Sequence, residues 1–337
     1  MLRMPMLSKN RIVKNISISL VPPALVFIVL MILTSLFGKP GFASGSDLLT
    51  IIYNMVFSGC IALAMSYNLT SGRLDFSIGS VLILSLIAGG SLAKMWDVGP
   101  IGFVILVIGF GLFLGLCSGF MYITLRLPAM VTSLGVTMIY ESIGFMLNEG
   151  KGVRLIGRFD MLIWARPPYN LLLLGFLLVI LIFLHNFTKF GYDAGALEGG
   201  QKNAVEVGVN ENINALISYT IAGGMMGAAG VIYLSQYGYI APQSGLSSSS
   251  FMMGAFLPVF IGGALAQYSD RNVGVVIGAF IQASISSAIV NLGFSSSMKT
   301  VIDGLIVLVF LIYLFNKHKF ELGKLYRQKK ARALAER

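Results

Sequence analysis

The chain alternates long apolar runs with short polar segments, and most runs have the length that crosses a membrane. A transmembrane helix needs about 20 consecutive, mostly apolar residues. The pattern predicts ten spans, over residues 17–37, 48–67, 76–95, 100–124, 130–148, 169–187, 213–235, 251–268, 272–292 and 298–316. The fold class expected is therefore all-α, a polytopic membrane protein with about ten transmembrane helices.

Small residues recur inside these runs at the spacing of a helix face. They are densest in the fourth and seventh runs, at Gly109, Gly111, Gly115, Gly119, Gly223, Gly224, Gly227 and Gly230. Small side chains let helix backbones approach closely in lipid. We interpret these glycines as packing residues.

Composition supports the membrane assignment. Of the 337 residues, 56% are hydrophobic and 11% charged, whereas soluble domains carry about 45–50% apolar and about 25% charged residues. The net charge of +10 could indicate a nucleic-acid partner. We reject that partner because the basic residues gather at the ends of apolar runs, where they orient helices.

The distribution of Lys and Arg predicts the orientation. If the amino terminus is cytoplasmic, 17 of the 24 Lys and Arg residues fall on the inner side and 7 on the outer side, as the positive-inside rule requires. Residues 1–16 then form a cytoplasmic segment, 17–316 a single transmembrane domain and 317–337 a basic cytoplasmic tail. The first run is long and no A-x-A-like cleavage site follows, so we interpret it as a retained span, not a signal peptide.

One loop does not fit this distribution. Residues 151–168, KGVRLIGRFDMLIWARPP, carry four basic residues on the expected outer side. Either a span is miscounted, or the loop faces an acidic surface outside the cell.

Motifs for catalysis are absent from the sequence. There are two histidines, His185 and His318, and no H-E-x-x-H, C-x-x-C, G-x-S-x-G or P-loop motif. Cys60 and Cys117 lie inside apolar runs and are interpreted as small hydrophobic residues. We expect no enzyme activity, no metal and no cofactor in this chain, so the energy for any transport must come from ions or from another subunit.

Ionisable residues inside spans are candidates for function, because they are costly in lipid. Asp303 follows Lys299 by four residues, which predicts a structural pair on one helix face. Glu141 has no partner in its own helix. It is either a hydrogen-bonding residue or a lining residue of a polar path.

A polar interruption at residues 66–80, SYNLTSGRLDFSIGS, is rich in turn and capping residues. Asp75 or Ser77 can cap the helix that starts at Ile78. The segment is either a short inner loop or a partly re-entrant break lining a polar cavity. Asn68, Asp75 and Ser77 are therefore candidates for a translocation path, together with Glu141.

The longest polar interruption, residues 188–212, lies on the expected inner side. Residues 201–207 predict a two-turn helix entered at Gly199 and Gly200 and closed by Gly208. Lys202 and Glu206 share one face of it. A helix this short is unstable alone in water, so it must rest on the membrane surface or on a cytosolic partner.

These residues carry a resemblance to a known family. The segments NLTSGRLDFSIGSVLILS, LRLPAMVTSLGVTMIYESI, FGYDAGALEGGQKNAVEVGVN and VFIGGALAQYSDRNVGVVIGAFI resemble, in order and spacing, motifs of the ribose/galactose-type permeases of bacterial ABC importers. The similarity covers the chain from about residue 68 to the last span.

The resemblance implies a permease subunit that imports a sugar or related polar solute across the bacterial inner membrane by alternating access. It implies a cytosolic ATPase, an extracytoplasmic solute-binding protein and a second permease as partners. The polar interruption would hold a coupling helix seated in the ATPase, through Glu198, Gly199, Gly200, Lys202, Ala204, Glu206 and Gly208.

The sequence departs from the family at several positions near the expected path. Arg73-Leu74 stand where one residue is usual, and Glu141-Ser142 replace an arginine-glycine pair. The solute therefore stays open among sugars, nucleosides and, more distantly, branched-chain amino acids. A different class, an ion-coupled secondary transporter using Glu141 and Asp303, is the alternative, and a membrane scaffold is a third interpretation.

Overall fold

The computed structural model describes residues 9–39, 42, 44–266, 268–295, 297–309, 311, 312 and 316. Its long helices are α1 (Lys9–Leu36), α2 (Gly45–Thr70), α3 (Ile78–Met95), α4 (Pro100–Leu125), α5 (Ala129–Met146), α6 (Tyr169–Phe187), α9 (Glu211–Tyr237) and α12 (Arg271–Asn291). The shorter helices are α7 (Lys189–Glu198), α8 (Gln201–Glu206), α10 (Ser250–Met253) and α11 (Phe256–Leu265). Short 3₁₀ turns η1 (Leu147–Gly150), η2 (Phe159–Ala165) and η3 (Ser247–Ser249) and strands β1 (Val153–Arg154) and β2 (Tyr239–Ile240) complete the set.

Nine helical segments of the described chain are long and apolar enough to cross a membrane. They match nine of the ten predicted spans, and the polytopic all-α class is confirmed. The tenth predicted span, 298–316, lies only partly within the described residues, of which 297–309 are helical. The predicted tail, 317–337, lies outside the described residues, and α1 begins before the predicted start of its span.

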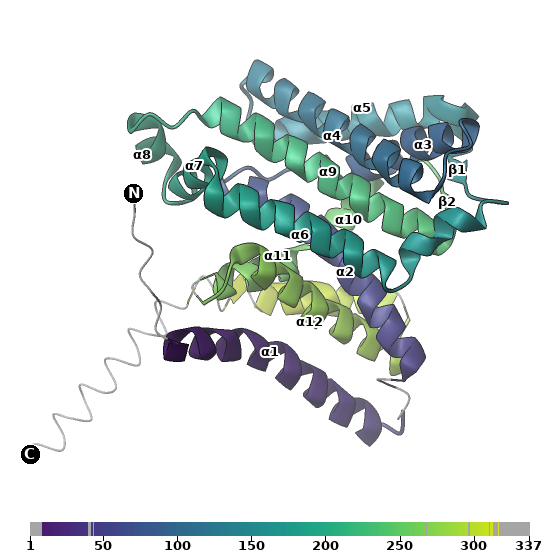
Figure 1. Ribbon diagram of the computed structural model, residues 1–337, viewed down its shortest axis with the longest axis vertical. Coiled ribbons are helices and arrows are strands. Elements are labelled where there is room, and N and C mark those ends of the chain that lie inside the picture. The colour runs from purple at the N-terminus through teal and green to yellow at the C-terminus, as the bar shows by residue number, and fades with distance from the viewer. Residues whose placement is uncertain are drawn as a thin grey trace, which may run out of the picture.

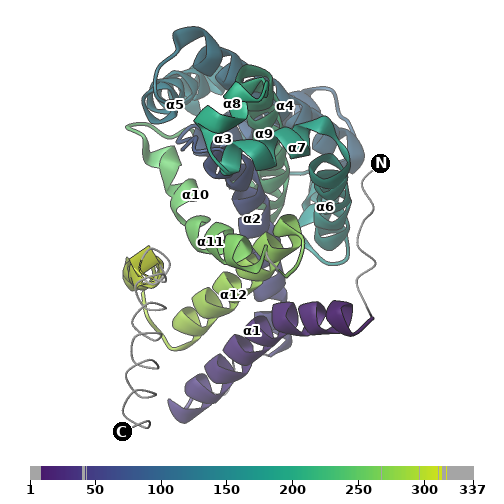
Figure 2. The same ribbon diagram turned by 90° about the vertical axis from the view of Figure 1, so that its left-hand side faces the viewer.

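Helix α2 runs through the middle of the bundle, and most of its second half is buried. It packs against α9 on one side and α12 on the other, while α1 lies along α12 at the edge of the molecule (Figure 1). Figure 2 shows α5 and α10 on the flank of the bundle opposite α6.

Helices α4 and α9 pack closely, and glycines make the approach possible. A β-carbon on Gly111 would lie 2.3 Å from the carbonyl oxygen of Gly223, and one on Gly115 would lie 2.3 Å from that of Tyr219. Any larger side chain would force the two backbones apart. This contact confirms the interpretation of Gly111 and Gly115 as packing residues, whereas a β-carbon on Gly109 would meet nothing within 4 Å.

The predicted span 251–268 corresponds to the candidate span Ser247–Leu265, in which the helix is broken. Helix α10 ends at Met253, and the chain turns at Gly254 and Ala255 before α11 begins. Pro258 has no backbone N–H and cannot bond to the carbonyl of Gly254, which explains the break. The sequence also gave no signal for the antiparallel pair β1–β2, in which Val153 lies opposite Ile240.

Candidate functional site

The predicted short helix in the polar interruption is present as α8. Gly200 precedes it with φ +144° and Gly208 follows with φ +93°, a region of backbone space that only glycine enters without strain. The preceding segment is also helical, as α7, so the interruption is a pair of short helices. Figure 1 shows the pair at one end of the bundle, beyond the ends of α6 and α9.

The side chains of α8 differ in what they face. Ala204 is 3% exposed and packs onto the rest of the chain, whereas Val205 is 47% and Val207 80% exposed. Lys202 and Glu206 are also exposed. Ala204 therefore faces inward, whereas the two valines stay exposed.

Polar contacts tie the α7–α8 pair to other helices. The Gln201 amide donates to the Glu211 carboxylate at the start of α9, and Arg271 at the start of α12 pairs with Glu198 at the end of α7. The Asn214 amide of α9 donates to the carbonyl oxygen of Phe190 in α7, at 3.3 Å. These contacts therefore connect any displacement of α7 and α8 to both α9 and α12.

Asn214 also connects this region to the loop between α2 and α3. Arg73 in that loop is fully buried, and its Nη2 donates to Asn214 Oδ1 at 2.9 Å and to Ser218 Oγ at 3.4 Å. Its Nη1 lies 4.0 Å from the Glu211 carboxylate. Burial lowers the pKa of the Arg73 guanidinium, and Glu211 opposes that shift. The sequence marked Arg73 as an inner basic residue and a departure from the family pattern, but it carried no signal for this contact.

The candidate path residues of the α2–α3 loop lie together and are buried. Asp75 accepts hydrogen bonds from the Ser77 backbone N–H at 2.9 Å, from Ser77 Oγ at 2.6 Å and from Asn68 Nδ2 at 3.3 Å. Burial raises the pKa of the Asp75 carboxyl, and the bonds from Ser77 and Asn68 lower it. Asp75 therefore holds the turn at Ser77, the residue before α3, whereas α3 itself has no side-chain cap hydrogen bond, so neither predicted capping role is seen.

Glu141 lies apart from this cluster and binds backbone. Its carboxylate oxygens accept from the N–H of Leu246 at 3.0 Å and of Ser248 at 3.1 Å, where the chain enters η3. The same turn packs closely against α3, since a β-carbon on Gly79 would lie 1.9 Å from the Ser248 carbonyl oxygen. Of the two options, the geometry matches the hydrogen-bonding residue.

The predicted pair of Lys299 and Asp303 forms. Lys299 Nζ lies 3.9 Å from the Asp303 carboxylate on the same helical segment. Within the ranges that the structure describes, no three His, Cys, Asp or Glu side chains gather as a metal site would require.

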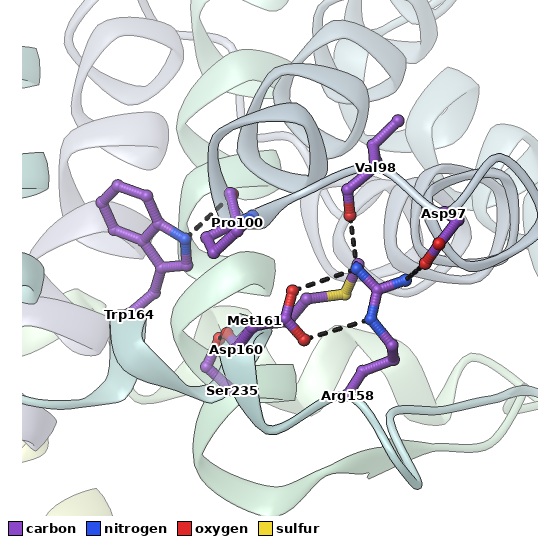
Figure 3. A network of polar contacts seen from close by, with 8 residues as sticks. All are labelled: Asp97, Val98, Pro100, Arg158, Asp160, Met161, Trp164 and Ser235. Carbon is purple, nitrogen blue, oxygen red and sulfur yellow. Dashed lines mark hydrogen bonds and ion pairs between the residues drawn. The ribbon is translucent and has the colours of Figure 1, made fainter.

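The basic loop between α5 and α6 is held against its own chain. Figure 3 shows the Arg158 guanidinium between Asp97 and Asp160, at 2.7 and 3.0 Å, with a further bond to the Val98 carbonyl oxygen. In the same view Trp164 donates to Pro100 and Ser235 to Met161. Hydrogen bonding to Arg158 holds the pKa of Asp160 below its usual value.

Two more basic residues of this loop have partners in the chain. Lys151 pairs with Glu149, and the Arg154 guanidinium lies 4.5 Å over the Tyr239 ring. Three of the four basic residues of the loop thus have acidic or aromatic partners in this chain. These contacts test neither of the two explanations that the sequence offered, a miscounted span or an acidic surface outside the cell.

Known proteins similar to this chain are import permeases. The chain is 29% identical to the autoinducer 2 import system permease protein LsrC of Photorhabdus laumondii over 77% of its length and 80% of the relative. It is 27% identical to LsrC of Escherichia coli K12 (84% and 85% covered) and 25% identical to the ribose import permease protein RbsC of Bacillus subtilis (85% and 90% covered).

A family model agrees with these relatives. The model described as branched-chain amino acid transport system / permease component matches residues 48–311, which include every candidate site residue above. With the multi-pass fold, this match confirms the prediction of a membrane permease subunit that is not itself an enzyme. The chain belongs to the family of branched-chain amino acid transport system permease components.

Proposed function

We propose that the chain is the membrane-spanning subunit of an ATP-binding-cassette importer for a sugar or a related small polar solute. The observation that carries this proposal is the α7–α8 pair. It presents Val205 and Val207 on the surface and is tied to α9 and α12 through Gln201–Glu211 and Glu198–Arg271. A partner that binds α8 could thus move the two long helices α9 and α12.

The absence of a P-loop in the sequence means that ATP must be hydrolysed elsewhere. We infer that a cytosolic ATPase subunit receives α8 in a groove that covers the two valines. Glu198, Gly199, Gly200, Lys202, Ala204, Glu206 and Gly208 then form the coupling segment. Alternating access is the two-state change that this contact would bias.

The proposal also includes the orientation of the chain in the membrane. The amino terminus and the tail lie in the cytoplasm of a bacterial cell, as the excess of Lys and Arg on that side favours. A second permease copy or a paralogue would complete the path, and an extracytoplasmic solute-binding protein would deliver the solute to the face that holds the α5–α6 loop. The names of the relatives, ribose and autoinducer 2 import permeases, favour a small hydroxylated solute over a branched-chain amino acid.

The ion-coupled alternative has less support. Both oxygens of Glu141 are occupied by backbone N–H groups, and Asp303 is paired with Lys299. A proton or cation carrier needs a carboxylate that can release such partners during each cycle.

Reconstitution separates the two functions. The chain is placed in proteoliposomes together with the proposed ATPase and solute-binding partners, with ribose as the probe solute. We expect uptake that requires ATP and survives an uncoupler of ion gradients. Uptake without ATP that the uncoupler abolishes would overturn the proposal, and lack of any solute flux would favour a scaffold.

A further inference from the structure

A cavity of about 230 Å³ opens where five helical segments converge. Its walls come from α2, the end of α9, α10, α12 and residues 297–309. Pockets for drug-sized ligands run to roughly 300–1,000 Å³, so this volume suits a smaller molecule. The cavity shares no residue with the α2–α3 loop cluster, with Glu141 or with α8.

Aromatic rings form one side of the cavity. The rings of Tyr53 and Phe57 in α2 are stacked at 6.2 Å, and Tyr237 meets Tyr53 edge-on at 6.2 Å. Phe251 of α10 stands edge-on to Phe57, also at 6.2 Å. Aromatic faces carry a partial negative charge, which attracts the weakly positive C–H groups of a hydroxylated ring.

Polar side chains also line the cavity. Gln282 of α12 is 7% exposed, and Ser58 donates to its Oε1 at 3.5 Å. Asn54 of α2 lines the same cavity. Amide side chains both donate and accept, which matches a hydroxyl group that does the same.

One buried polar atom of the cavity wall has no partner. Tyr53 is 5% exposed, and its hydroxyl oxygen has no hydrogen-bond partner within 3.5 Å in the part of the chain that the structure describes, although the Tyr237 side chain lies beside it. A buried hydroxyl without a partner costs free energy. A ligand hydroxyl in the cavity would satisfy it.

We propose that this cavity is a solute-binding subsite for a small, neutral, hydroxylated ring molecule. Lys299 and Asp303 at its rim compensate each other's charge at 3.9 Å, so the site has no net charge to attract an ion. The inference rests on the proposed function and deepens it by naming where the permease itself contacts the solute. In the proposed orientation Tyr53 lies about 12 Å below the outer end of α2, on the way in.

Transport by conservative variants tests the subsite. In the reconstituted complex, Tyr53→Phe and Gln282→Leu should each raise the ribose concentration for half-maximal uptake about tenfold, since each removes one or two hydrogen bonds to the solute. ATP hydrolysis should stay within about twofold of the wild type. Tyr169→Phe, which removes a tyrosine hydroxyl outside the cavity wall, is the matched control and should change neither.

Direct protection gives a second readout. Ser58→Cys, made in a Cys117→Ala background because Cys117 is partly accessible, places a thiol at the cavity wall. Ribose should slow its reaction with a maleimide, and leucine should not. Protection by leucine alone would overturn the neutral, hydroxylated class of ligand, and equal reaction with and without ribose would overturn the subsite.

The outcomes also distinguish this inference from the function on which it rests. ATP-driven ribose uptake that is unchanged in Tyr53→Phe and Gln282→Leu would refute the subsite and leave the importer standing. Uptake by the wild type that does not need ATP would refute the proposed importer function itself.

Discussion

The carboxylate of Glu141 and the backbone N–H of Ser248 form a buried hydrogen bond of 3.1 Å between residues that are 107 positions apart. The N–H of Leu246 occupies the other oxygen. This contact fixes α5 to the turn that leads into the broken helix α10–α11. Glu141 is therefore a positioning residue, and its removal should lower the stability of the folded protein.

Glu141→Ala should destabilise the protein more than Glu141→Gln. Alanine leaves the buried N–H of Ser248 unsatisfied, at about 1–3 kcal/mol, together with the partly buried N–H of Leu246, whereas glutamine keeps one acceptor oxygen. Thermal unfolding in detergent measures the order, with Ser142→Ala as the control, because that exposed hydroxyl bonds only within its own helix. ATP-driven uptake by Glu141→Gln with an unchanged pH profile is expected; complete loss of uptake with a stable fold would instead indicate an ion-carrying carboxylate.

The exposed valines of α8 give the cleanest test of coupling. Val207→Asp should lower ATP-driven uptake at least tenfold, because a charge replaces an apolar side chain that we place in the ATPase groove, while membrane insertion is unchanged. Asn212→Asp adds the same charge nearby at an exposed polar position and should have little effect. Copurification of the ATPase subunit with each variant measures the contact itself.

Ala204→Arg tests the seating of α8 on its own chain. Ala204 is buried against the rest of the protein, so arginine there should displace α8 and abolish coupled uptake even if Val205 and Val207 are intact. Insertion into the membrane should persist, since the nine candidate spans of the described chain do not include α8. Normal uptake by Ala204→Arg would contradict a coupling role for this helix.

The spans could be predicted from the sequence, whereas the long-range polar contacts could not. A lipid environment forces backbone groups to bond within a helix, so apolar length alone located α6 at Tyr169–Phe187, the range expected. Glu141 gave no such local signal, since its partners are backbone groups over a hundred residues away that any sequence could supply. The same holds for Arg158 and Asp97, 61 residues apart, and for the cavity, whose walls come from five segments.

Arg73 should transmit movement between α9 and the α2–α3 loop. Arg73→Lys keeps the charge but loses the guanidinium fork that reaches Asn214 and Ser218, so ATP hydrolysis should continue while uptake per ATP falls several-fold. Arg73→Gln should also destabilise the fold by about 1.5–3 kcal/mol for each lost charged hydrogen bond. Arg126→Gln, at an exposed position, is the control. Equal uptake per ATP in Arg73→Lys and the wild type would restrict Arg73 to a structural role.

The Arg158 contacts predict a pH dependence of the α5–α6 loop. Hydrogen bonding from Arg158 lowers the pKa of Asp160 in the folded protein below its unfolded value. The stabilisation is therefore present above the unfolded pKa of about 3.9 and is lost as the pH falls through the folded value. Its size is small, because the pair is partly exposed and screened by salt. Unfolding temperatures between pH 6 and pH 3 should fall less steeply in Asp160→Asn than in the wild type. Asp193 in α7 provides the control, because its carboxylate forms no ion pair among the described residues. The unfolding temperature of Asp193→Asn should follow the wild-type slope.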